Sequence, residues 1–152
     1  SATGKHYVAC TPLPVDVAFV HAHKADWLGN TRVEPKLIWM DNEIVNAAAS
    51  TVVSVERLVD HAEFVSSPHL TTYPRFMVEG VCEARWGAYP TSLFPDYGYH
   101  GEFFSEYSTA ARDVGAFKEF FAERVVEPPS WEAFLEANGG IGTCLAIRRQ
   151  PA

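Results

Sequence analysis

Two histidines separated by one residue, His21 and His23, are the first feature of the sequence that could do chemistry. They follow an apolar run that is expected to form a strand, so both imidazoles would lie on one face, about 7 Å apart. That spacing suits a metal ion, for which Asp26 would be the nearest third ligand. Hydrogen-bonded histidines at a strand exit are the simpler interpretation, and we expect no metal site.

Three cysteines, Cys10, Cys82 and Cys144, form no CxxC pair, which argues against a zinc ribbon or a disulfide scaffold. A reducing cytoplasm fits this usage best. Cys82 precedes an aromatic loop and could be a nucleophile, but nothing nearby in the sequence supplies a base or a helix N-terminus that would lower its pKa. We expect a buried, inert cysteine in a strand.

Four glutamates, Glu43, Glu56, Glu79 and Glu83, could serve as carboxylate nucleophiles or general bases. Solvated or salt-bridged roles are the default for all four, and we assign no catalytic residue to the chain.

The loop that follows the predicted strand at residues 76–84 is rich in Trp, Gly, Tyr and Pro. In open α/β sheets ligands bind at the carboxyl ends of strands, so this loop is the place to seek a site. The backbone N–H groups of Gly87 and Ala88 could steady an oxyanion, or the two residues could form a plain turn. Gly87 and the pair Gly139-Gly140 do not form a phosphate-binding fingerprint.

Along the chain, short apolar runs typical of strands alternate with segments in which apolar residues have helical spacing. This order predicts a layered α/β fold with a mainly parallel sheet and flanking helices, which must position these residues. Buried strands are predicted at residues 15–22, 51–55 and 76–84. Helices are predicted at 43–49 (capped by Asp41-Asn42), 56–61, 103–111, 117–125 and 131–137 (capped by Ser130). Residues 141–147 form either a final edge strand or a packed tail. The aromatic residues of 103–121 are most simply core, with an interface as the alternative.

The bulk composition limits the class of protein further. The 152 residues, 47% hydrophobic, suit a single domain over residues 1–152, and the net charge of −7 argues against a nucleic-acid partner. No run reaches 18 apolar residues, so we expect no membrane partner and a cytoplasmic protein.

Four ordered segments carry a family resemblance. They are DVAFVHAHKADWLGN from Asp16, TVVSVERLV from Thr51, SPHLTTYPRFMV from Ser67 and WGAYPT from Trp86. In this order they resemble the alpha subunits of class I CoA-transferases, of which the glutaconate type is the nearest. Relatives of that family include hydrolases that open cyclic diketone rings on CoA thioesters. Tyr89 stands where the family usually has His, and Arg85 where it usually has Pro.

The resemblance implies a NagB/RpiA-type half-domain, because the chain matches only the C-terminal half of such subunits. Ser1, where a Met is expected, favours a processed or excised chain. The family's glutamate nucleophile lies on the beta subunit, and the working glutamate of the ring-opening relatives lies in the missing alpha half, so no Glu here inherits either role.

The resemblance also implies coenzyme A as a substrate, no permanently bound cofactor, and companion chains that supply the missing alpha half and the beta subunit. The chain would be part of a heteromeric transferase for acyl-CoA thioesters and carboxylates. The alternatives are a CoA-thioester hydrolase or a non-catalytic interface subunit. The substrate-binding residues would be Trp86, Gly87, Ala88, Tyr89 and Pro90, beside a structural loop that includes His23, Lys24, Asp26 and Asn30.

Overall fold

The computed structural model describes residues 4–6, 8–35 and 38–148, and the chain divides into two compact units, Ser1–Glu83 and Ala84–Ala152. Each unit has its own cluster of buried apolar side chains. Our expectation of one domain over residues 1–152 therefore stays a prediction. Ser1, on which the expectation of a processed start depends, lies outside the described residues.

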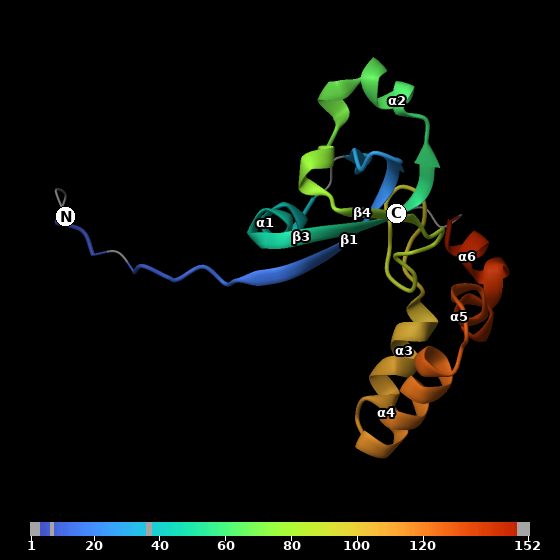
Figure 1. The fold of residues 1–152 in the computed structure, drawn as a ribbon. Coiled ribbons are helices and arrows are strands. Elements are labelled where there is room, and N and C mark those ends of the chain that lie inside the picture. Colours follow the sequence, from blue (N-terminus) through green and yellow to red (C-terminus); the bar gives the residue numbers. More distant parts are fainter. Residues whose placement is uncertain (1–3, 7, 36–37, 149–152) are drawn as a thin grey trace. The chain divides into compact units, whose positions relative to one another are not determined.

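The first unit is built on a mixed sheet of four strands in the order β2-β1-β3-β4 (Figure 1). The strands are β1 (Val15–Asp26), β2 (Thr31–Arg32), β3 (Ala48–Val59) and β4 (Gly80–Glu83). β3 pairs in parallel with both β1 and β4, and only the short β2 is antiparallel. The predicted α/β fold with a mainly parallel sheet is confirmed.

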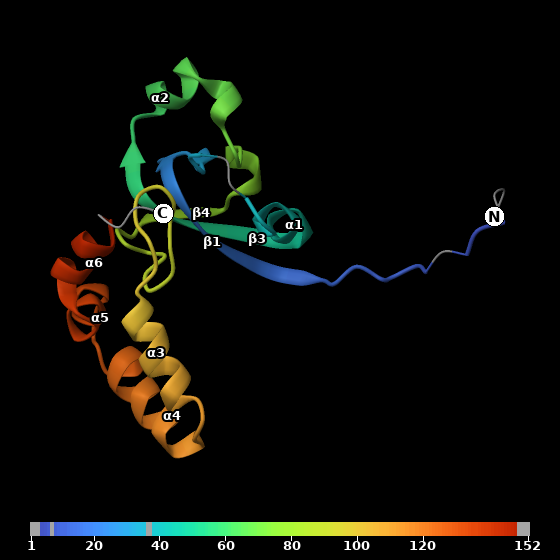
Figure 2. The same ribbon diagram turned by 180° about the vertical axis from the view of Figure 1, so that it is seen from behind.

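The central strands β1 and β3, of 12 residues each, are longer than the sequence predicted. Figure 2 shows the same sheet from behind. The prediction of helical turns over residues 56–61 is wrong, because Arg57 and Val59 continue the ladder opposite Lys24 and Asp26. Helix α2 (His61–Ser66) begins only after Asp60, whose Oδ1 accepts a hydrogen bond from the backbone N of Ala62 at 2.8 Å. Pairing with a long neighbouring strand outweighs the local helical preference.

Helix α1 (Asp41–Ala47) confirms the predicted helix but not its cap. Met40 occupies the N-cap without a side-chain hydrogen bond, and Asp41 lies inside the first turn, where its charge complements the helix dipole. Val45 is the buried residue of α1 and packs on the sheet. Two short 3-10 helices, Pro68–Leu70 and Arg75–Met77, interrupt the connection from α2 to β4.

The third predicted strand is shorter and more exposed than expected. β4 covers only four residues, at the edge of the sheet, and none of them is fully buried. The prediction of a buried strand over residues 76–84 is therefore wrong in length and burial. A strand that has a neighbour on one side only, under an uncovered face, cannot bury its side chains.

The two faces of the sheet differ in cover. The core lies mainly on one face and consists of Val20, Ala22, Ala25, Val45, Val53, Val55 and Tyr73, of which Ala25 alternates to the other face near the end of β1. On the other face Phe19 is 77% exposed and Val17 44%, although both belong to a central strand. Large apolar side chains on a central strand are normally covered, so the part of this face around Val17 and Phe19 lacks a covering layer, whereas His23, farther along β1 on the same face, is buried.

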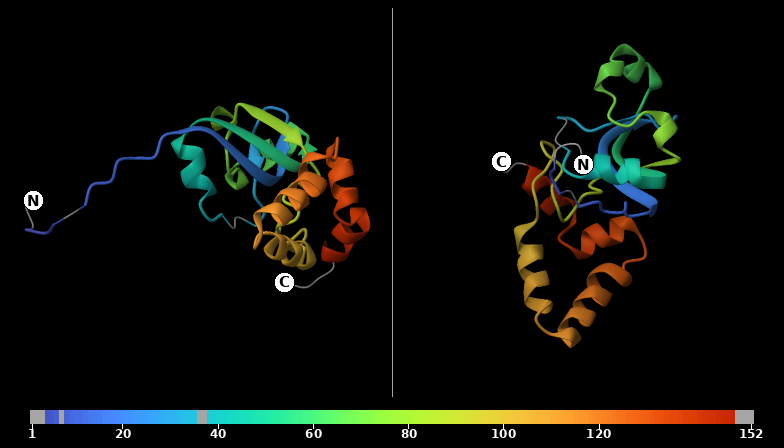
Figure 3. Two further views of the ribbon diagram at one scale, coloured as in Figure 1. Left: turned by 90° about the horizontal axis from the view of Figure 1, so that it is seen from below. Right: turned by 90° about the vertical axis from the view of Figure 1, so that its left-hand side faces the viewer.

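The second unit is helical, with α3 (Gly101–Ala110), α4 (Val114–Phe121), a π-helical turn (Ala122–Val126), α5 (Trp131–Ala137) and α6 (Gly140–Arg148). Helices α3 and α4 run side by side as a hairpin (Figure 3). Ser130 caps α5 as predicted, since its Oγ accepts from the backbone N of Ala133 at 3.2 Å. Among the described residues no helix combines the length and apolarity needed to cross a bilayer.

Two expectations for the second unit are corrected. Residues 141–147 are helical, and the edge-strand alternative is wrong: Cys144 and Ile147, the buried pair, have helical spacing. The aromatic residues of α3 and α4 are not simply core. Of that set only Phe103 is buried, and the others stack on one another while Tyr107 and Phe121 stay exposed by 43% and 46%.

Candidate functional site

The exit of β1 is organised by one buried carboxylate, that of Asp26, which has no exposed surface. Its Oδ1 accepts from the backbone N of Leu28 at 3.0 Å and of Asn30 at 2.9 Å. Its Oδ2 accepts from Asn30 Nδ2 and from His61 Nδ1, each at 2.7 Å. Burial works to raise the pKa of Asp26, but the hydrogen bonds from Asn30, His61 and Leu28 outweigh it and leave that pKa below its usual value.

A second polar group holds the same strand end to α2. Lys24 Nζ lies 2.5 Å from Glu63 Oε1 and 2.9 Å from Glu34 Oε2. Burial works to lower the pKa of Lys24, and its two carboxylate partners raise it more. His23 Nδ1 accepts from the backbone N of Glu34 at 3.0 Å. These contacts bring His23, Lys24, Asp26 and Asn30 together, and their side chains support the loop from within.

The pair His21 and His23 does not converge on a metal. His21 lies between Ser54 Oγ, 2.8 Å from Nδ1, and Glu56 Oε1, 3.0 Å from Nε2. Both histidines are hydrogen-bonded, as the simpler interpretation predicted. Among the described residues no group of three or more His, Cys, Asp or Glu side chains could hold a metal ion.

The loop that begins the second unit places two of its predicted site residues in a core rather than at a surface. Trp86 and Tyr89 are 8% and 5% exposed and pack in the second apolar cluster. Trp86 has φ of 65°, the left-handed conformation that turns the chain after Arg85. Gly87, Ala88 and Pro90 are half-buried.

The predicted oxyanion donors of this loop are already used. The backbone N of Gly87 donates to Ala84 O at 3.0 Å, and that of Ala88 donates to Tyr97 Oη at 3.0 Å. An oxyanion would have to compete with both bonds, so the alternative of a plain turn describes these N–H groups better.

The structure contradicts the prediction for Cys82 and shows the surroundings of the four glutamates. Cys82 is exposed, so the expectation of a buried cysteine is wrong, because its side chain lies on the uncovered face of the sheet opposite Ser54. Glu43, Glu79 and Glu83 are exposed, in line with the expected solvated roles, whereas Glu56 is buried beside His21. Glu79 also accepts from Ser50 Oγ, and Glu83 accepts from the backbone N of Leu58 at 2.8 Å.

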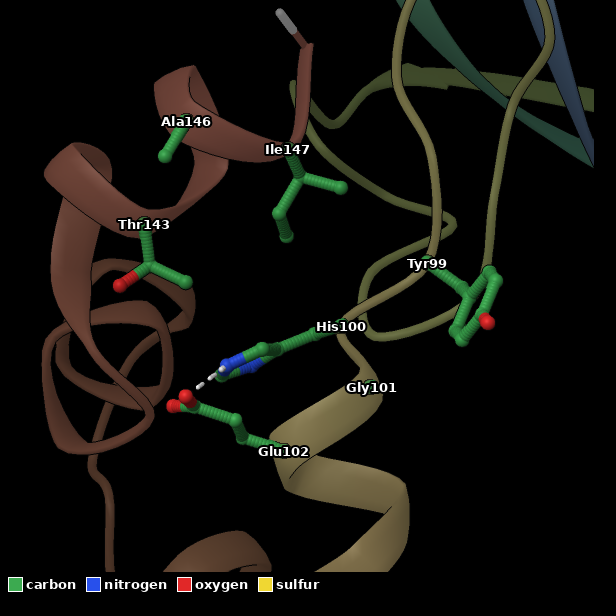
Figure 4. A pocket seen from close by; sticks show the side chains of 7 residues that line it. All are labelled: Tyr99, His100, Gly101, Glu102, Thr143, Ala146 and Ile147. Carbon is green, nitrogen blue, oxygen red and sulfur yellow. Dashed lines mark ion pairs between the residues drawn. The ribbon is translucent and has the colours of Figure 1, made fainter. Parts of the chain in front are cut away.

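One cavity was missed by sequence reasoning. It measures about 380 Å³ and lies within the second unit, lined by Tyr99, His100, Gly101, Glu102, Thr143, Ala146 and Ile147 (Figure 4). The start of α3 supplies His100, and α6 supplies the opposite wall. The available signal was a histidine directly before a glycine-started helix, but nothing local indicates that residues 143–147 would face it.

Comparisons of the sequence and of the fold with known proteins identify the same family. A family model described as coenzyme A transferase matches residues 1–84. The chain belongs to the coenzyme A transferase family. It is similar to a cholesterol ring-cleaving hydrolase IpdA subunit of Mycobacterium tuberculosis, at 34% identity over 74% of this chain and 39% of the relative. It is also similar to a glutaconate CoA-transferase subunit of Acidaminococcus fermentans, at 29% identity over 87% of this chain and 41% of the relative.

The solved structure of glutaconate coenzyme A-transferase from Acidaminococcus fermentans matches with a TM-score of 0.83 and 26% identity. The match covers 90% of this chain and 43% of that chain. The family resemblance and the CoA-transferase-like fold are thus confirmed, and the chain is a component of an enzyme family. It spans only 31% to 43% of the length of the curated relatives it matches.

Proposed function

We propose that this chain is the C-terminal part of a subunit of a heteromeric CoA-transferase-like enzyme that acts on acyl-CoA thioesters and carboxylates. Coenzyme A would be a substrate, and companion chains would supply the rest of the alpha subunit and the beta subunit. The observation that carries the proposal is the uncovered sheet face, on which Phe19 is 77% exposed.

The shape of the sheet supports a missing partner. β4 is a four-residue edge strand, and β1 has a neighbour on its outer side only at Lys24 and Ala25. Unpaired strand edges and an uncovered apolar face invite additional strands and helices. The relatives have the additional length that such a layer needs.

The glutamates of this chain support a nucleophile elsewhere. Glu56 is bound to His21, Glu79 to Ser50 and Glu83 to the backbone N of Leu58. The family resemblance implies a glutamate of the beta subunit that attacks the acyl-CoA carbonyl, forms an anhydride and then holds CoA as a glutamyl thioester. The role proposed for this chain is one wall of the shared pocket.

Within that wall the loop 86–90 has two parts. Gly87, Ala88 and Pro90 are half-buried and are proposed to face the substrate, while Trp86 and Tyr89 hold them from the core. The loop after β1 is proposed to be structural. It borders a second hollow of about 190 Å³, to which Gly29 and Gly80 contribute.

The test reconstitutes the chain with the companion chains and compares two variants. Phe19→Asp places a charge on the uncovered face, and Phe76→Asp is the control, because Phe76 is 84% exposed on the 3-10 helix Arg75–Met77 rather than on a strand. We expect Phe19→Asp to abolish both the assembly seen by native mass spectrometry and CoA transfer, and Phe76→Asp to preserve both. Assembly of the Phe19→Asp variant at wild-type level would contradict the proposal.

A ring-cleaving or thioester hydrolase is the second candidate, favoured by the identity of 34% to the hydrolase subunit compared with 29% to the transferase subunit. The same assembly distinguishes the two functions. Release of free CoA without a carboxylate acceptor supports a hydrolase, and dependence on the acceptor supports a transferase. An assembly with neither activity supports the non-catalytic interface role.

A further inference from the structure

The cavity at the start of α3 contains a histidine whose two ring nitrogens have different surroundings. His100 Nδ1 lies 2.6 Å from Tyr89 Oη. Its Nε2 points toward the cavity side and lies 3.9 Å from Glu102 Oε2 (Figure 4). That distance is too long for a hydrogen bond. The side chain of Glu102 is 93% exposed, so water rather than His100 solvates its carboxylate.

The hydrogen-bond partners of Tyr89 determine the tautomer of His100. Tyr89 Oη lies 2.6 Å from the backbone carbonyl oxygen of Asn138, which can only accept, so the phenol proton is donated there. The phenol oxygen is then an acceptor toward His100, and Nδ1 of His100 must carry the proton. In the neutral ring the lone pair is therefore on Nε2.

The Tyr89 phenol stays protonated over the ordinary pH range. Burial, together with the charges around it, raises the pKa of Tyr89 to about 12, so the phenol keeps the proton that it donates to Asn138. Asn138 is itself held, because its Nδ2 donates to Phe134 O at 2.7 Å and to Arg124 O at 3.2 Å. Tyr89 is thus a positioning residue for the imidazole.

We propose that this cavity is a binding site for a small ligand that carries a hydroxyl group, with His100 Nε2 as the acceptor of the hydroxyl proton. Among the described residues no donor is found within hydrogen-bond distance of Nε2, so the acceptor is available. The cavity volume of about 380 Å³ suits a small molecule. Ala146 and Ile147 of α6 supply an apolar wall for the body of the ligand. The site shares Tyr89 with the loop 86–90 of the proposed pocket wall, but binding of a hydroxyl group by His100 requires no step of the CoA chemistry.

The first experiment determines the tautomer. Nitrogen-15 NMR of the full chain, at a pH at which the ring is neutral, distinguishes a protonated from a bare ring nitrogen. We expect Nδ1–H and bare Nε2 for His100 in the wild type, and a mixture of tautomers in Tyr89→Phe, which removes the acceptor. Thr143→Val is the control within the same cavity and should leave the tautomer unchanged. A protonated Nε2 in the wild type would overturn the proposal.

The second experiment measures binding with phenol as the probe, and with anisole, which has the same ring but no hydroxyl proton. Phenol should shift the resonances of His100 and Ile147 saturably, and anisole should bind about tenfold more weakly, as expected for one lost hydrogen bond.

Two substitutions of His100 test the contributions of its two ring nitrogens to phenol binding separately. His100→Asn can keep the bond to Tyr89 but places no acceptor at the Nε2 position, so phenol binding should weaken about tenfold. His100→Gln carries an oxygen near the Nε2 position and should retain more of the affinity. Equal binding of phenol and anisole, or no saturable shift with phenol, would refute the site whether or not the chain assembles into a transferase.

Discussion

Replacing Asp26 by Asn tests whether the buried carboxylate organises the exit of β1. The side chains are nearly identical in shape, so packing is preserved while one oxygen becomes an NH2 group. The remaining oxygen can still accept from the backbone N of Leu28 and Asn30. The NH2 group would face Asn30 Nδ2 and His61 Nδ1, which are both donors at 2.7 Å in the wild type.

The expected cost follows from these two lost contacts. A hydrogen bond to a charged group contributes roughly 1.5–3 kcal/mol. His61 is 41% exposed and can change tautomer, which relieves one conflict. Asn30 cannot flip freely, because its Oδ1 accepts from the backbone N of Arg75 at 3.1 Å. We therefore expect the D26N variant to lose about 3 kcal/mol of the free energy of unfolding.

Urea unfolding of the full chain, followed by circular dichroism, measures this difference. Asp60→Asn is the matched control, because Asn caps a helix as well as Asp and the change should stay within about 0.5 kcal/mol. A loss below about 1 kcal/mol for D26N would refute the assigned role.

The comparison of the wild type with D26N also predicts that their difference in stability depends on pH. The pKa of Asp26 is lower in the folded than in the unfolded chain, so the unfolded chain binds more protons in acid. The contribution of Asp26 is complete above the unfolded pKa of about 3.9 and is lost as pH falls toward the lower folded value. The stability difference between wild type and D26N should therefore shrink over that acid range.

Two further predictions concern the two units separately. Val53→Ala removes two methyl groups from a fully buried position of β3 and should cost about 2 kcal/mol of unfolding free energy in urea, whereas Val65→Ala, at a position 63% exposed, should change it by less than about 0.5 kcal/mol. Ser130→Ala removes the cap of α5 and should cost about 1 kcal/mol in thermal unfolding, while Ser130→Asp restores most of it; equal stability of the two Ser130 variants would contradict the cap.

The sequence predicted the sheet well where a strand is buried on the core face. The apolar runs at 15–22 and 51–55 lie within β1 and β3, because continuous apolar runs mark central parallel strands. It failed at residues 56–61, since Glu56, Arg57 and Leu58 have no strand pattern of their own and are extended only through pairing with β1. It also failed for β4, because this strand has a neighbouring strand on one side only and none of its four residues is fully buried.

The site was predictable in part. Asp26 and Asn30 were expected in a structural loop at the exit of β1, and Asn30 donates to Asp26 there through its backbone N and Nδ2; the place of this loop near a substrate site stays a prediction. The burial of Trp86 and Tyr89 depends on Leu135 and Ile147, which follow some fifty residues later and carry no local mark of that contact. The cavity beside His100 was missed for the same reason.

Two features of the first unit indicate how assembly with a companion chain would affect the exit loop of β1. The exit loop of β1 is fixed by Asp26 and Lys24 through partners that all belong to the first unit, so this loop keeps its geometry without a companion. Phe19 and Cys82, on the opposite face from the core, have no such cover. A companion chain would then cover the sheet face that carries Phe19 and Cys82 without having to position the exit loop of β1. Substitutions on that face should therefore impair assembly while leaving the unfolding free energy of the isolated chain nearly unchanged.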